Sequence, residues 1–227
     1  MTRSPYFSPR PPLDTAPATR AAFARLYRAA VAPGTGQPIA YTLAAPKWQF
    51  LCWLCETQDI VLHGSGNPGI AEFEPRQSND IEEFGNRQAV YAASDGIWPI
   101  YFAVMDRDRY VRSLSNACFR EVDAAGTRSE PYYFFSINGD ALPHQPWRQG
   151  TIYLLPRATF EQQPLLALGG ERFEVAQWAS LVPVRPLARL AVGPDDFPFL
   201  SQIYPHDPSV LRERAARNPA GFPWMDE

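Results

Sequence analysis

The sequence predicts an α+β protein, in which helices come first along the chain and many short strands follow. Residues 18–31 carry apolar side chains at helical spacing, including Phe23, Leu26 and Tyr27, and a second such stripe begins after Pro46. After about residue 106 the apolar runs are short and end at turn residues, which is typical of strands. Helices and strands that are grouped in this way favour α+β over an alternating α/β fold.

Length and composition narrow the class of protein. The chain has 227 residues, of which 45% are hydrophobic and 13% aromatic, so it can bury the core of one domain and is not disordered throughout. The formal net charge of −3 does not favour a strongly basic nucleic-acid binder. No apolar run is long enough to span a membrane, and the start of the chain lacks the apolar segment of a signal peptide. We therefore expect a cytoplasmic protein with no membrane partner.

The prolines divide the chain into a core and two flanks. Of the 24 prolines, 8 fall in residues 1–46 and 6 in residues 194–227. Proline opposes helix interiors and central strands, so the regular core is predicted at about 47–192. Residues 1–16 are predicted to be a Pro-rich tail that is extended or disordered, and residues 17–227 a single domain.

The expected elements follow from the same periodicity and capping rules. Helices are expected at 18–31, from 47 onward, from Ser94 or Asp95 to about 105, and at 207–218. Asn138-Gly139 predicts a hairpin turn. Strands are expected at 59–63, 88–92, 117–122, 132–137, 151–155, 172–175, 178–184 and 187–192.

Two motifs have a structural interpretation that we prefer. Cys52 and Cys55 form a CxxC motif inside an apolar helical stripe, where core packing is expected rather than redox chemistry or a metal site. Residues 64–69 match GxGxxG after a strand, but Pro68 and Pro75 oppose the helix that a dinucleotide fingerprint requires. Neither motif predicts a cofactor site.

His63 is a different case, because it ends an apolar strand directly before Gly64. A histidine there presents its ring at a sheet edge, and the glycine lets the backbone approach a ligand closely. A histidine with a purely structural role is the alternative.

Three motifs in a fixed order extend this argument. His63-Gly64-Ser65 is followed by the strand 89–94 (AVYAAS) with Tyr91, by two aromatic residues 10 and 11 positions later, and by Gln177-Trp178 on a late strand. This set, over about residues 59–184, resembles the ADP-ribosyltransferase fold of the poly-ADP-ribose polymerase and diphtheria-toxin type. The resemblance implies a split β-sheet core with flanking N-terminal helices.

The resemblance also implies a substrate and a reaction. The substrate is NAD, and the reaction transfers ADP-ribose to an unknown protein, nucleic-acid or small-molecule acceptor with release of nicotinamide; no metal is expected. Binding roles are implied for His63 at the adenosine ribose hydroxyls and for the Gly64 backbone at the nicotinamide amide. Ser65 could add a contact through its hydroxyl, and Tyr91 with Tyr101 or Phe102 would stack on the nicotinamide ring.

The sequence departs from the family at the position of its glutamate. Gln177 stands there, and a neutral amide can hydrogen-bond but cannot stabilise a developing positive charge as a carboxylate does. Glu174 is the alternative carboxylate, although an odd offset on one strand places it on the opposite face unless a bulge intervenes. Gln177 and Glu174 are therefore the candidate catalytic residues.

Three other functions stay open at this point. The same fold can serve as a non-catalytic nucleotide-binding or interaction module. An RNA 2′-phosphotransferase-like activity works on this fold without the glutamate, relying on histidine and arginine. A small-molecule enzyme on an unrelated β-rich fold is expected if His63, Tyr91 and Gln177 lie far apart.

Overall fold

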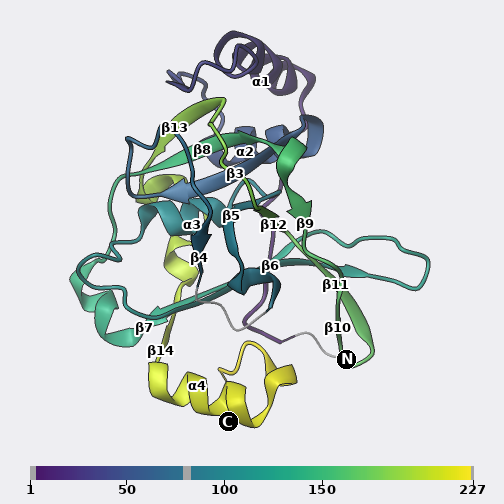
Figure 1. Cartoon of the computed structure of the whole chain (residues 1–227), viewed down its shortest axis with the longest axis vertical. Helices are drawn as coiled ribbons and strands as arrows, with labels where there is room; N and C mark the ends of the chain where they lie inside the picture. Colours follow the sequence, from purple (N-terminus) through teal and green to yellow (C-terminus); the bar gives the residue numbers. More distant parts are fainter. Residues whose placement is uncertain (1–3, 79–82, 226–227) are drawn as a thin grey trace.

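The computed structural model describes residues 4–78 and 83–225, which form two β-sheets with a small number of helices (Figure 1). The helices are α1 (Pro17–Ala30), α2 (Lys47–Thr57), α3 (Trp98–Val104) and α4 (Pro208–Arg217). All four lie where apolar spacing and capping residues predicted helices. The α+β class is confirmed.

The first sheet, sheet A, is built around two long antiparallel strands. Its strand order is β1-β7-β6-β11-β10, and β14 also pairs with β7. The strands are β1 (Ser8–Pro9), β6 (Leu114–Val122), β7 (Tyr132–Asn138), β10 (Leu166–Leu168), β11 (Glu171–Val175) and β14 (Tyr204–His206).

The second sheet, sheet B, contains all three motif strands. Its order is β2-β13-β8-β3-β5-β12-β9, and β4 also pairs with β5. The strands are β2 (Gln37–Pro38), β3 (Ile60–Ser65), β4 (Arg76–Gln77), β5 (Gln88–Ala93), β8 (Gly150–Pro156), β9 (Glu161–Gln162), β12 (Gln177–Ser180) and β13 (Ala188–Val192).

The main hydrophobic core lies where α2 and α3 meet both sheets. It joins Leu62 of β3 and Phe135 of β7 to residues of the two helices such as Leu51 and Tyr101. A second cluster, with Val61 and Phe73, covers the other face of sheet B. The proline-rich flanks contribute buried side chains such as Phe23 and Phe197, so the core draws on more of the chain than residues 47–192.

The N-terminal segment is extended and packs against sheet A. Ser8 and Pro9 pair with Tyr133 and Tyr132 of β7, and the ring of Phe7 lies edge-on to Phe119 at 5.0 Å between centroids. Of the two states predicted for residues 5–12, the extended one is found after a turn at Pro5 and Tyr6. Pairing to β7 satisfies backbone groups at Ser8 and Pro9, and aromatic contacts anchor the segment.

The predicted hairpin at Asn138-Gly139 is wrong. β7 belongs to sheet A and the next strand, β8, to sheet B, and the short 3₁₀ helix Gly139–His144 connects them. The side chain of Asn138 is fully buried, and its Oδ1 accepts the backbone N–H groups of Arg112 and Ser113. Asn138 therefore fixes a neighbouring loop rather than a two-residue turn.

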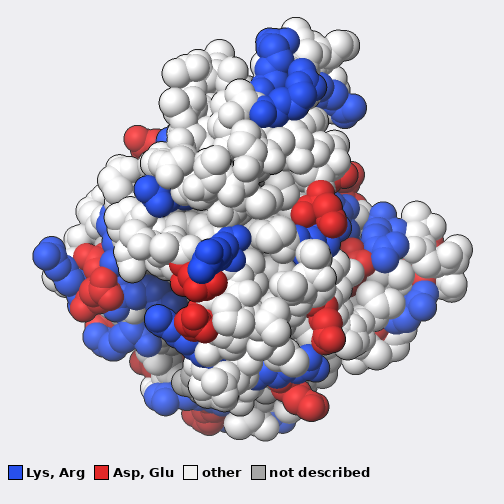
Figure 2. Space-filling model, turned by 45° about the horizontal axis from the view of Figure 1, so that its top comes forward, with Lys and Arg blue, Asp and Glu red and all other residues white. Residues whose placement is uncertain are grey.

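Charged residues of both signs are mixed over most of the face in Figure 2. The exception is a group of basic residues at the top of the view, over α1. Helix α1 carries the exposed Arg20, Arg25 and Arg28 and no acidic residue. No helix among the described residues is both long and apolar enough to cross a membrane.

Helix α3 lies unusually close to sheet B, because two glycines leave room for its backbone. A Cβ atom on Gly64 would overlap the carbonyl oxygen of Pro99, and one on Gly150 would overlap that of Ala103. Both obstacles are helix backbone, which cannot turn aside as a side chain can. The approach of α3 to β3 and β8 therefore requires glycine at these two positions.

We expect Gly150→Ala to lower the free energy of unfolding by about 2–3 kcal/mol, because the added methyl group forces α3 away from the sheet. Gly69→Ala is the matched control, since its nearest neighbour would be Asn67 Oδ1 at 3.5 Å, an ordinary contact. Urea denaturation followed by circular dichroism measures both variants. Equal midpoints for Gly150→Ala and the parent chain would show that the close approach is not needed.

Candidate functional site

The three motif strands are neighbours in sheet B, in the order β3-β5-β12 (Figure 1). β5 pairs with β12 over four residue pairs, from Gln177↔Ala93 to Ser180↔Val90. β3 pairs with β5 at Leu62↔Ala93. His63, Tyr91 and Gln177 thus lie on three consecutive strands of one sheet.

β3 and β5 separate beyond this single pair. On its other side β3 stays paired with β8 over six residue pairs, as far as Ser65↔Thr151. The pairing of described residues between β3 and β5 ends at Leu62 and Ala93, one residue before His63. Sheet B is therefore split between the His63 strand and the Tyr91 strand.

The peptide groups of Gly64 point into this split. In antiparallel sheets the N–H and C=O groups of successive residues point alternately to the two neighbouring strands. Arg157 N–H donates to Asp59 C=O at 3.1 Å, which places the peptide groups of the odd-numbered residues on the β8 side. Those of Leu62 and Gly64 accordingly point toward β5.

His63 bridges the split. Its Nδ1 donates to the carbonyl oxygen of Tyr91 at 2.7 Å, and its ring packs at 56° to Phe73 with 4.7 Å between centroids. This bond fixes the neutral tautomer in which Nε2 is the acceptor. Burial of the imidazole ring lowers the pKa of His63, although the bond to Tyr91 acts in the opposite direction. The neutral ring is therefore the favoured form at pH 7.

A pH dependence follows from the lowered pKa of His63. In the unfolded chain His63 takes up a proton below about pH 6.5, whereas the folded chain resists this protonation. The contribution of His63 to the free energy of unfolding is therefore fully present above that pH and is lost as the pH falls. His206, whose pKa burial also lowers, adds to the same trend. We expect the urea midpoint to fall between pH 7 and pH 5.5, less steeply for His63→Gln than for the parent. Identical slopes would contradict this account.

Ser65 and the glycine loop after it are held by hydrogen bonds. The hydroxyl of Ser65 accepts the N–H of Asn67 at 3.1 Å. The buried Tyr153 donates its hydroxyl to Asn67 C=O at 2.7 Å and accepts the N–H of Ile70 at 3.0 Å. No helix follows in residues 66–78, as expected for a loop that is not a dinucleotide fingerprint. Sequence reasoning missed Tyr153, which reads as an ordinary strand residue.

Tyr91 and Gln177 share one face of the sheet, and His63 lies on the other. Residues opposite one another in a pair point to the same face, so Tyr91 points with Ala179 and Gln177 with Ala93. His63 instead contacts Phe73 on the opposite face. The hydroxyl of Tyr91 donates to Phe84 C=O at 2.8 Å and accepts the N–H of Arg87 at 2.7 Å. The ring of Tyr91 is therefore held against the segment 84–87.

The two aromatic residues of α3 that the resemblance singled out, Tyr101 and Phe102, differ in their surroundings. Tyr101 is fully buried against Phe135, with 4.7 Å between centroids, and its hydroxyl donates to Ser136 C=O at 2.8 Å. Burial raises the pKa of Tyr101. Phe102 is half-buried beside Trp98. Tyr101 has a structural role in the core, and Phe102 is the less buried of the two rings.

Glu174 and Gln177 lie in different sheets. Glu174 is in β11 of sheet A, opposite Arg120, and its Oε2 accepts from Arg128 Nε at 2.6 Å. The chain passes into sheet B between these residues, so the alternation expected along one strand does not apply. The carboxylate of Glu174 is already engaged in an ion pair.

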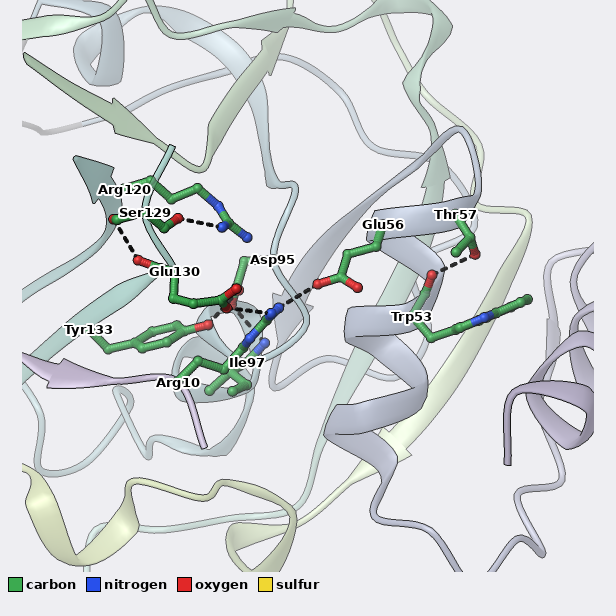
Figure 3. Close-up of polar contacts among 10 residues, drawn as sticks. All are labelled: Arg10, Trp53, Glu56, Thr57, Asp95, Ile97, Arg120, Ser129, Glu130 and Tyr133. Atoms are coloured by element: carbon green, nitrogen blue, oxygen red, sulfur yellow. Dashed lines mark hydrogen bonds and ion pairs between the residues drawn. The ribbon is translucent and has the colours of Figure 1, made fainter. Parts of the chain in front are cut away.

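A polar cluster behind the split supports the start of α3 (Figure 3). The buried Asp95 accepts the N–H groups of Ile97 and Trp98 through Oδ1 at 2.8 and 2.7 Å, and the Tyr133 hydroxyl through Oδ2 at 2.6 Å. Nearby, Arg10 forms ion pairs with Glu56 and Glu130 at 2.5 and 2.7 Å. The helix cap was expected at Ser94 or Asp95, but the N-cap is Ile97, and Asp95 bonds the first N–H groups from two residues before it.

Cys52 and Cys55 are buried in α2, and burial raises the pKa of both thiols. Both side chains belong to the main hydrophobic core, as the apolar helical stripe predicted, and a raised pKa disfavours the thiolate. In residues 4–78 and 83–225, histidine, cysteine and acidic side chains form no group of three or more that could hold a metal ion.

Comparison of the chain with protein-family models, with curated proteins and with solved structures finds no match. The function of the site must therefore be argued from its geometry.

Proposed function

We propose that the split between β3 and β5 binds NAD, and that the protein transfers ADP-ribose from NAD to an acceptor with release of nicotinamide, on an ADP-ribosyltransferase-like fold. The observation that carries the proposal is the adjacency of the three motif strands, with β3–β5 pairing that ends at Leu62, two residues before Gly64. A split at this point leaves the peptide groups of Gly64 next to the ring of His63. Both can form hydrogen bonds with polar groups of a nucleotide.

Each group has a chemical counterpart in NAD. The nicotinamide carboxamide offers an N–H donor and a C=O acceptor, which complement the C=O and N–H of Gly64. Nε2 of His63 can accept a hydrogen bond from a hydroxyl of the adenosine ribose, because Nδ1 donates its proton to Tyr91 C=O. Tyr91 and Phe102 supply aromatic faces for the nicotinamide ring. Ser65 holds the glycine loop beside the site, because its hydroxyl accepts the N–H of Asn67.

The proposed reaction breaks the bond between ribose C1′ and the nicotinamide nitrogen. Nicotinamide leaves with the bonding electron pair, and the acceptor forms the new bond to C1′ and loses a proton. The ribose carries positive charge as the old bond breaks. Gln177, on the face of Tyr91, can orient the ribose by hydrogen bonding but supplies no negative charge.

A second candidate is a nucleotide-binding module without catalysis. It is favoured by the neutral Gln177 and by the ion pair that ties Glu174 to Arg128 at 2.6 Å. In that case NAD binds in the same split but is not cleaved.

Incubation with NAD and candidate acceptors, followed by chromatographic measurement of free nicotinamide, tests the proposal. Release that depends on protein and falls in His63→Ala supports the transferase. NAD binding without release identifies the binding module. Absence of both release and binding would refute the proposed site.

A further inference from the structure

Gln163 is a buried amide beside Gln177 that the sequence did not single out. It follows β9 directly and is 4% exposed. Its Oε1 is buried and has no hydrogen-bond partner within the described part of the chain. Nearly all buried polar side-chain atoms in proteins have a partner, so this oxygen needs an explanation.

The strand register places Gln163 opposite Gln177. β9 pairs with β12 at Gln162↔Trp178. One residue further along, the N–H of Gln163 donates to Gln177 C=O at 3.0 Å, so these two residues lie opposite one another. Residues opposite one another share a face, with Cβ atoms about 5 Å apart. The two glutamines therefore lie side by side on the face that Tyr91 occupies, and Gln162 lies on the other face with Trp178.

A bound ligand explains the free oxygen. A carbonyl oxygen can only accept, so the missing partner is an O–H or N–H group. The site as proposed brings the nicotinamide ribose next to Gln177, within reach of the paired glutamine, and this ribose carries two hydroxyl donors. Oε1 is shielded from solvent without ligand, so the amide must turn as the ribose enters.

We propose that Gln163 is a ribose-binding residue of the NAD site, whose side-chain oxygen accepts a hydrogen bond from a hydroxyl of the nicotinamide ribose. The inference rests on the proposed function. Two neutral amides, Gln163 and Gln177, then hold the ribose where a single carboxylate would otherwise bind it. The pair orients the ribose and supplies no charge.

Calorimetric titration of the full chain with two ligands tests this role. The first ligand is NAD, and the second is an NAD analogue without hydroxyls on the nicotinamide ribose. Gln163→Met keeps the length of the side chain and removes the polar atoms, and Gln162→Met is the matched control on the opposite face. We expect Gln163→Met to weaken NAD binding roughly fivefold to tenfold and to leave the analogue unaffected. Gln162→Met should bind both ligands as the parent does.

A stability measurement separates ligand binding from folding. If the oxygen is kept for a ligand, replacing it with an apolar group of similar shape should not lower the urea midpoint. Should Gln163→Met bind NAD as tightly as the parent, lose affinity for both ligands equally, or unfold at lower urea, the role of Gln163 is overturned while the NAD site stands. Should the parent not bind NAD at all, both proposals fail.

Discussion

Asp95→Ala is expected to lower the free energy of unfolding by about 3–5 kcal/mol, a large fraction of the stability of a typical domain. The carboxylate accepts three hydrogen bonds, from the N–H groups of Ile97 and Trp98 and from the hydroxyl of Tyr133. Alanine leaves these buried donors without an acceptor, and each unsatisfied donor costs about 1–3 kcal/mol. The loss also frees the start of α3, which packs on Gly64.

Urea denaturation of three variants tests this role. Asp95→Asn keeps an oxygen at the helix start and should lose less stability than Asp95→Ala. Asp195→Ala removes an exposed carboxylate and should change the free energy of unfolding by less than about 0.5 kcal/mol. If Asp95→Ala is as stable as Asp195→Ala, the cluster in Figure 3 does not support α3.

Gln177→Glu is expected to raise the rate of nicotinamide release from NAD by about 10²–10³-fold. A carboxylate beside the ribose would stabilise the positive charge that develops as the glycosidic bond breaks, and one well-placed electrostatic group is typically worth about 3–4 kcal/mol in the transition state. The substitution keeps the size of the side chain. The position is half-buried in β12 beside Ala93, so the backbone need not move.

The control is Gln162→Glu, which places the same charge on the other face of the sheet, opposite Trp178. It should leave the rate of nicotinamide release unchanged. NAD binding that persists in Gln177→Glu without any gain in nicotinamide release would show that the face of Gln177 does not hold the reacting ribose. Faster nicotinamide release in both variants would show that the added negative charge acts regardless of its position.

Local patterns in the sequence predicted the elements, because side-chain spacing and capping act over a few residues. The stripe after Pro46 became α2, and the apolar run at 59–63 became β3. The carboxylate of Asp95 bonds the first N–H groups of α3, although the cap position itself is Ile97. These features depend on neighbours along the chain and not on distant partners.

Long-range pairing could not be predicted in the same way. Asn138-Gly139 has the composition of a hairpin, but the burial of Asn138 and its bonds to another loop decide its conformation. The extended N-terminal segment depends on aromatic residues far along the chain, such as Phe119. Likewise, the pairing of Gln163 with Gln177 is a matter of register, which one sequence does not reveal.

The sequence predicted on which strand each candidate site residue lies more reliably than the direction in which its side chain points. The resemblance implied that His63, Tyr91 and Gln177 lie together. Their strands β3, β5 and β12 are neighbours, but the side chain of His63 points to the face opposite Tyr91 and Gln177. The core position of Tyr101 and the ion pair of Glu174 depend on sheet A, which packs against α3 and contains β11. Only the tertiary arrangement separates Phe102 from Tyr101.

Titration of the purified chain with NAD in a calorimeter tests the central claim most directly, because it requires no acceptor. We predict one NAD bound per chain, with affinity reduced in His63→Ala. His144→Ala, which removes an exposed histidine stacked on Tyr110, should bind NAD as the parent does. No heat beyond dilution, or equal affinity in the parent and His63→Ala, would contradict an NAD site at the split between β3 and β5.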